Sequence, residues 1–298
     1  MQARSNNWAD SKHRDYSRAR SNCTSYHSSQ PLSTTSAMLK VGRDFEALQA
    51  TRPDFRRDAE VTFSKPPNPA WKEGDGANDG GESLKKDHVE IDPHADGRSV
   101  ASNYKLLISG MVPRPIALIS TKSEDGKTTN LAPFSYAQLI NHDPPLFIVG
   151  FVGSLDKAKD TLKNLNETKE CVINIISEHF VEAANSTAIN APYGHSEWDV
   201  SGLTQGPTSV VKPARVKESI LAIEGKLVET KEFESRAVPG KKSSVLAIIE
   251  GVRFWVREDA IDKEQSVIDL KVLKPISRLG GISYGRTTDA IEIPRPNF

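Results

Sequence analysis

The sequence has few cysteines, no long apolar run and no excess of either charge. Its 298 residues include two cysteines, Cys23 and Cys171, and 39 basic residues balance 39 acidic ones. Two distant cysteines cannot form a disulfide framework, and they indicate a reducing compartment. The zero net charge provides no basic field to attract nucleic acid or an anionic membrane surface. We therefore expect a cytoplasmic protein that acts on a small-molecule substrate and has no nucleic-acid partner.

The apolar runs are also too short for a membrane protein. None approaches the roughly 18 to 20 residues that a helix needs to cross a bilayer, and the N-terminus lacks a secretory apolar segment. Residues 1–37 are instead rich in Ser, Asn and Arg. This composition has too little apolar surface to offset its ordering entropy, so we predict a disordered tail. The short apolar runs lead us to expect no membrane partner. An Arg- and Ser-rich start also leaves a mitochondrial presequence open, although the amphipathic stripe is missing.

Residues 38–98 are predicted to form an irregular N-terminal extension. GRDFEALQA favours a short helix, but the proline and glycine residues of SKPPNPAWKEGDGANDGGESLKK prevent long regular elements. Trp71 is the single aromatic residue of that second stretch. We expect it to dock on a folded domain that spans residues 99–298.

The folded domain carries five short apolar runs of strand length. They are rich in β-branched or aromatic residues, and they cover residues 115–121, 146–152, 171–177, 220–229 and 244–257. Two helices fit between them, at DTLKNLNETK and HFVEAANSTAI. Because helices do not follow every strand, the pattern favours a mainly β fold, an antiparallel barrel with a few helices, over a doubly wound parallel sheet.

Several common catalytic and binding motifs are missing. No G-x-G-x-x-G follows a strand, and there is no G-x-S-x-G. His179 and Glu182 lie three apart on a predicted helix, but no third ligand accompanies them. The sequence therefore favours neither a dinucleotide-binding fold, a hydrolase nor a metal site.

The segment DKAKDTLKNL favours an anion. Lys157, Lys159, Asp160 and Thr161 lie where a helix is predicted to begin. The unpaired N–H groups and the dipole of a helix N-terminus attract phosphate, and lysines and a hydroxyl can complete the site. The alternative is that Asp160 only caps the helix.

The segment NLAPFS, residues 130–135, favours a flat ligand with polar edges. Asn130 can both donate and accept hydrogen bonds, Pro133 fixes the backbone and Ser135 supplies a small hydroxyl. These groups can hold the edge of a heterocycle.

Six motifs together resemble one known family. VPRPIALIST, NLAPFSY, DPPL, KDTLKN, GLT and KPISRLGG occur in the order found in the flavin reductase-like family, the FMN-binding split barrels, and the resemblance covers about residues 100–296. It implies a split β-barrel with Greek-key-like antiparallel strands. It also implies that FMN is held by Arg114, Ser120, Thr121, Asn130, Ala132, Pro133, Ser135, Lys157, Lys159, Asp160 and Thr161.

The resemblance further implies the reaction and the partners. The expected function is an FMN-dependent oxidoreductase in which NADH or NADPH reduces the flavin by hydride transfer, with Ser135 as the catalytic hydrogen-bond partner of the flavin. The alternative is an FMN electron carrier, similar to flavoredoxin, without its own nicotinamide site. We also expect a homodimer, and an electron-acceptor protein or oxygenase as a partner.

Other residues are weaker candidates. Arg278 and Tyr284 match a late signature of the same family, but a structural role is at least as well supported. His142 and His195 are lone histidines for which a structural role is favoured. The connection at residues 191–204 is predicted to shape the mouth of a pocket, with Trp198 available for stacking.

Overall fold

The computed structural model describes residues 45–296, in two compact units that divide between Arg57 and Asp58. In the first unit, residues 45–50 are helical, which confirms the short helix predicted from GRDFEALQA. The predicted disordered tail lies outside the described residues. The second unit carries all the remaining elements.

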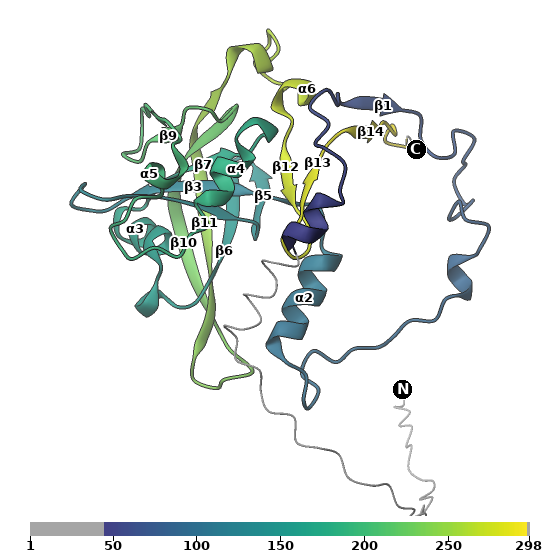
Figure 1. Ribbon diagram of the computed structural model, residues 1–298, viewed down its shortest axis with the longest axis horizontal. Coiled ribbons are helices and arrows are strands. Elements are labelled where there is room, and N and C mark those ends of the chain that lie inside the picture. The colour runs from purple at the N-terminus through teal and green to yellow at the C-terminus, as the bar shows by residue number, and fades with distance from the viewer. Residues whose placement is uncertain (1–44, 297–298) are drawn as a thin grey trace, which may run out of the picture. The chain divides into compact units, whose positions relative to one another are not determined.

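A seven-stranded sheet forms the body of the second unit, and all its neighbouring strands are antiparallel (Figure 1). Its order is β4-β3-β7-β10-β11-β6-β5. The bounds are β3 Ala117–Lys122, β4 Thr129–Phe134, β5 Ala137–His142, β6 Pro145–Val152, β7 Glu170–Ile175, β10 Leu221–Glu234 and β11 Lys242–Val256. The five predicted runs are therefore strands. β4 and β5, the two outer strands, come from the segment in which the sequence had indicated only a ligand site.

Side chains from the two faces of this sheet enter different apolar clusters. Ile119 and its neighbours pack with α3 (Asp160–Thr168), whereas Leu118 packs with residues of α4 (Val181–Ser186) and α5 (Glu197–Ser201). Adjacent residues on β3 separate in this way because successive side chains of a strand point to opposite faces. The first cluster includes Cys171, and burial raises the pKa of its thiol to about 12.

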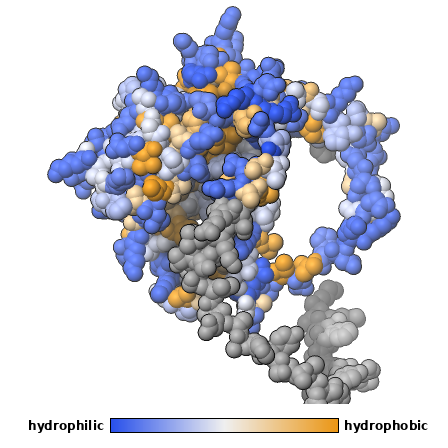
Figure 2. All heavy atoms as spheres, in the orientation of Figure 1, coloured by the Kyte–Doolittle hydropathy of each residue, from blue (hydrophilic) through white to orange (hydrophobic). Residues whose placement is uncertain are grey.

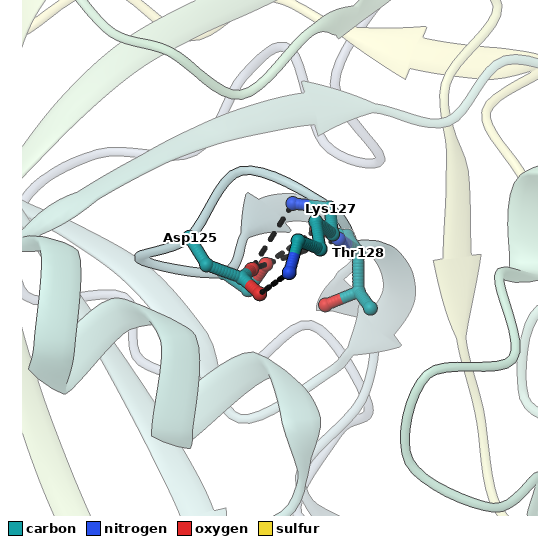
Figure 3. A network of polar contacts seen from close by, with 4 residues as sticks. Asp125, Lys127 and Thr128 are labelled. Carbon is teal, nitrogen blue, oxygen red and sulfur yellow. Dashed lines mark hydrogen bonds and ion pairs between the residues drawn. The ribbon is translucent and has the colours of Figure 1, made fainter.

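The turn between β3 and β4 sets the register of the outer strand β4 (Figure 3). Asp125 accepts hydrogen bonds from the Ser123 hydroxyl and the Lys127 backbone N–H, at 2.7 and 3.1 Å. Gly126 occupies the left-handed region, with φ of 71°, where a side chain would be strained. The bond from Ser123 lowers the pKa of Asp125 most, and the bonds from Lys127 lower it further. The closed turn places Asn130 opposite Thr121.

Smaller elements surround the sheet. A three-stranded sheet has the order β13-β12-β2, and two two-stranded sheets pair β1 with β14 and β8 with β9. These strands are β1 Thr62–Ser64, β2 Arg114–Pro115, β8 Gln205–Gly206, β9 Arg215–Val216, β12 Ile276–Arg278, β13 Tyr284–Arg286 and β14 Asp289–Ile291. The remaining helices are α2 Val100–Gly110, α6 Leu270–Leu273, and the 3-10 turns η1 Ser83–Lys85, η2 Leu155–Lys157, η3 Glu178–Phe180 and η4 Glu258–Ala260. Within residues 45–296, no helix combines the length and apolar character needed to cross a membrane.

The chain between β1 and α2 is irregular, as the sequence indicated, and almost entirely exposed. Figure 2 shows it as a mostly hydrophilic arc. Trp71 in this arc is 45% exposed, and its ring N–H donates to the carbonyl of Gly76. Its side chain therefore closes a turn within the extension. The contact that was expected from Trp71 is made by β1. This strand pairs in parallel with β14, beside the buried Val61.

Candidate functional site

A cavity of about 500 Å³ opens beside the outer strand β4, and we call it the β4 cavity. Its walls come from β4, the end of β6, the start of α3, the loop that follows α4, Glu197 of α5, residues of α2, and the C-terminal segment around Arg278. Eight of the eleven residues predicted to hold the cofactor line it: Arg114, Asn130, Ala132, Pro133, Ser135, Lys159, Asp160 and Thr161. The two segments singled out in the sequence therefore meet at one place.

Within residues 45–296 no further strand pairs with the outer edge of β4, so the backbone of this strand is open on the side of the cavity. The N–H of Leu131 donates to Glu197 rather than to β3, so the odd-numbered positions of β4 point their backbone groups outward. Pro133 lies at such a position, where a residue without an N–H costs the sheet no hydrogen bond. This explains how a proline fits within the strand.

A buried polar network fixes Asn130 at one end of the strand. Its amide oxygen accepts from the hydroxyls of Thr161, at 2.5 Å, and Thr121, at 3.3 Å, and its nitrogen donates to Glu197 Oε2 at 2.9 Å. Asn164 on α3 also donates to Thr121. The network therefore joins β3, β4, α3 and α5, and it holds the start of α3 against the outer strand.

The start of α3 presents free backbone donors. Lys159 is the N-cap residue, its conformation is extended, and no side chain caps the helix. The alternative in which Asp160 caps the helix is therefore wrong, since Asp160 is already the first helical residue. The Lys159 ammonium lies 3.3 Å from the Asn190 side-chain oxygen across the cavity wall. An anion at this helix start would meet N–H groups, a lysine and the positive end of the dipole.

Two arginines lie opposite each other where β2 pairs with β12. Arg114 donates through Nη1 to the carbonyls of Ile108 and Met111, which satisfies the end of α2. Arg278 stacks over the ring of Tyr284 at 4.4 Å and donates to Gly281. Within the described residues, Arg114 Nε and Arg278 Nη1 are buried without a hydrogen-bond partner. Both side chains line the β4 cavity, so each brings an unused donor to its surroundings.

Three predicted cofactor residues do not line the cavity. Ser120 is buried on the other side of β3 and donates to the carbonyl of Ala214. Thr121 is buried behind Asn130 and acts through it. Lys157 is exposed in η2. Of the two candidate lysines, the structure therefore places only Lys159 at the cavity.

The connection at residues 191–204 contributes a residue that the sequence reading missed. Glu197 is 5% exposed and lines the cavity. Its neighbour Trp198 is 4% exposed and belongs to an apolar cluster, so the expectation that it stacks on a ligand is wrong. His142 and His195 are exposed and do not line the cavity.

Part of the exposed lining of the cavity is aromatic or aliphatic. Tyr104 on α2, Tyr136 between β4 and β5, and Ile189 after α4 line it, and each is about half exposed. α2 itself was not expected from the sequence. Its signal was Ser99, whose side chain accepts a hydrogen bond from the Ser102 N–H as an N-cap.

Comparisons with known proteins agree on one family. Residues 109–270 match the family model described as the flavin reductase like domain. A protein of Halalkalibacterium halodurans is 34% identical over 204 residues, which are 68% of this chain and 95% of that protein.

Solved structures extend the likeness to the fold. The crystal structure of nitrilotriacetate monooxygenase component B from Bacillus cereus has a TM-score of 0.65 and 32% identity, and the match covers 70% of this chain and all of that one. A protein from Shewanella frigidimarina, described as a flavin reductase with a split barrel domain, has a TM-score of 0.55 and 24% identity, with 67% and 93% covered. The split-barrel fold predicted from the sequence is thereby confirmed.

Proposed function

This chain belongs to the flavin reductase like domain family, and on that premise we propose that it is an FMN-dependent oxidoreductase whose flavin occupies the β4 cavity. The observation that carries the proposal is the meeting of the open edge of β4 with the uncapped start of α3 in one cavity. A cavity of about 500 Å³ lies within the range of cofactor sites, roughly 300 to 1,000 Å³.

The residues present suit the two ends of FMN. Lys159 and the backbone N–H groups at the start of α3, that of Thr161 included, would hold the phosphate, whereas the Thr161 hydroxyl already donates its hydrogen to Asn130 Oδ1. Ala132, Pro133 and Ser135 would border the flat ring. The unpartnered Nη1 of Arg278 is a further donor that a polar ligand atom would satisfy.

When bound, the flavin supplies the hydride chemistry, and the protein contributes position, hydrogen bonds and exclusion of water. Ser135 lines the cavity and makes no hydrogen bond to any residue that the structure describes. Its hydroxyl is free to donate to, or accept from, the N5 atom of the ring. The half-exposed rings of Tyr104 and Tyr136 would offer a nicotinamide a surface on which to pack. No titrating side chain is required at the reacting carbon.

We further propose NADH or NADPH as the reductant, a homodimer as the working form, and an electron-acceptor protein or oxygenase as the partner. The Bacillus cereus relative is by its name one component of a monooxygenase. That name supports an oxygenase as the class of acceptor.

The test is the absorption spectrum of the purified full chain with FMN, recorded anaerobically before and after NADH or NADPH. A bound flavin that bleaches with either nucleotide supports the oxidoreductase. Colour that persists with both nucleotides and bleaches only with dithionite would favour the electron carrier. Failure to bind any flavin at micromolar concentration would overturn the proposal.

A further inference from the structure

Glu197 places a buried carboxylate in the wall of the β4 cavity, and only one of its oxygens is used by the protein. Oε2 accepts from Asn130 Nδ2 at 2.9 Å and from the Leu131 N–H at 3.0 Å. Oε1 has no hydrogen-bond partner among residues 45–296, although Glu197 is only 5% exposed. Oε1 is not among the side-chain atoms that are buried without a partner, so it remains accessible, and Glu197 lines the cavity. A donor on a ligand in the cavity can therefore reach this oxygen.

The position of Glu197 along the cavity indicates which part of a bound ligand would donate a hydrogen bond to Oε1. Glu197 contacts β4 at Asn130 and Leu131, and Asn130 is bonded to Thr161 at the start of α3. The strand then continues by about 3.3 Å per residue toward Ser135. Glu197 thus lies beside the point where β4 meets the start of α3, and the strand runs from there toward the end that would border a ring.

We propose that Glu197 is a specificity residue that accepts hydrogen bonds from the hydroxyl groups of a ligand's polyol chain. This inference rests on the proposed function, in which the phosphate and the ring of FMN lie at the two ends of the cavity. A carboxylate is a strong acceptor for neighbouring hydroxyls. The same residue is a poor neighbour for a second anion, so it selects a neutral hydroxylated chain next to the anion-binding end of the cavity.

A conservative substitution separates this role from a structural one. In Glu197→Gln the side-chain carbonyl can still accept from Asn130 and Leu131, so the polar network keeps its bonds. The amide group then faces the cavity with donors in place of an acceptor. Glu182→Gln is the matched control, because Glu182 is an exposed carboxylate on α4 that does not line the cavity.

The experiment measures the affinity of the full chain for lumiflavin, riboflavin and FMN by flavin fluorescence. Lumiflavin has the ring alone, riboflavin adds the polyol chain and FMN adds the phosphate. We expect Glu197→Gln to weaken riboflavin and FMN by the same factor, about tenfold, which is the effect of one charge-assisted hydrogen bond. Lumiflavin affinity and the melting temperature should stay as in the wild type and in Glu182→Gln.

Two results would overturn the assignment. Equal losses for all three flavins would mean that Glu197 acts on the ring or on the shape of the cavity. Unchanged affinities for all three would mean that it contacts no ligand. In both cases wild-type binding of FMN would leave the proposed function standing, whereas a wild-type chain that binds no flavin would overturn the function and this inference together.

Discussion

At the scale of single residues, Lys159 and Lys157 differ only in where the chain places them. Both precede α3, but only Lys159 lines the β4 cavity. We expect Lys159→Ala to weaken FMN binding by about 1.5 kcal/mol, roughly tenfold, because one charge-assisted contact to phosphate is lost. Riboflavin, which has no phosphate, should bind as before.

The matched control for this prediction is Lys157→Ala, which removes the same charge from an exposed neighbour. Fluorescence titration of both variants with both flavins makes the comparison. Equal losses for FMN and riboflavin in Lys159→Ala would place the phosphate elsewhere.

Ser135 carries the second prediction at this scale. Ser135→Ala should keep FMN bound and slow its reduction by roughly tenfold to a hundredfold, about 1.4 to 2.7 kcal/mol of barrier, because its hydroxyl lines the cavity and is free to bond the bound ring. The rate should vary little between about pH 6 and 8, since no titrating group is required. Stopped-flow bleaching with NADH or NADPH measures this. An unchanged rate would remove Ser135 from the mechanism.

At the scale of elements, Glu224 ties the loop before β9 to β10 and β11. The carboxylate is fully buried and accepts from the N–H groups of Ser209, Val210 and Val211 and from the ring N–H of Trp255. Burial alone would raise the pKa of Glu224, but these hydrogen bonds outweigh burial and hold the pKa below its ordinary 4.5. The ionised form is therefore the one that the fold stabilises.

The sign of this shift predicts a pH dependence of stability. The contribution of Glu224 is complete above pH 4.5 and is lost as the pH falls through its lowered pKa. Glu224→Gln should lower the free energy of unfolding by about 1.5 to 3 kcal/mol at pH 7, and the difference from wild type should shrink in acid. Urea unfolding at several pH values measures it, with exposed Glu229→Gln on the same strand as the control. A difference that is constant with pH would contradict the assignment.

At the scale of the whole molecule, we expect the outer strand β5 to form the interface with a second copy of the chain. Leu139 and Ile140 on β5 are about half exposed, and β5 has no partner on its outer edge within the described residues. Exposed apolar outer strands attract further chains, and twofold pairing is the commonest way to cover them. We therefore expect a homodimer by light scattering and a monomer after Leu139→Glu with Ile140→Glu.

The control for the dimer is Val228→Glu, which adds a charge at an exposed apolar residue of β10. It should leave the dimer intact. A wild-type chain that is monomeric at micromolar concentration with its flavin bound would contradict the predicted homodimer.

The sequence predicted most of the sheet because the inner strands carry buried runs of β-branched and other apolar residues. It did not reveal that residues 129–142 form the two outer strands, since proline and polar residues there obscure a strand pattern. α2 was missed for a related reason: of its apolar residues only Ile108 is buried, so no buried stripe marks the helix. Strands that lie at an edge carry weaker signals than those in the core.

Site residues could be predicted from the sequence where a single short segment carries them. They could not be predicted where residues far apart in the sequence come together only in the folded structure. Lys159, Asp160 and Thr161 are consecutive at a helix start, so one short segment marked them as candidates, and all three line the cavity. Glu197 reaches Asn130 across 67 residues of chain. In the sequence its neighbour Trp198 is the stronger candidate, because a tryptophan in a polar connection resembles a binding residue until its burial is known.

The parallel pair of β1 and β14 has a consequence for the intact chain. β1 is three residues long, and a short strand of this kind is held in place largely because the chain between β1 and α2 keeps it close to its partner. That connecting arc is exposed throughout most of its length, where proteases cut most readily. A single cut there would turn an internal pairing into one between two separate molecules, and dilution would then release the N-terminal fragment while the seven-stranded sheet stayed folded.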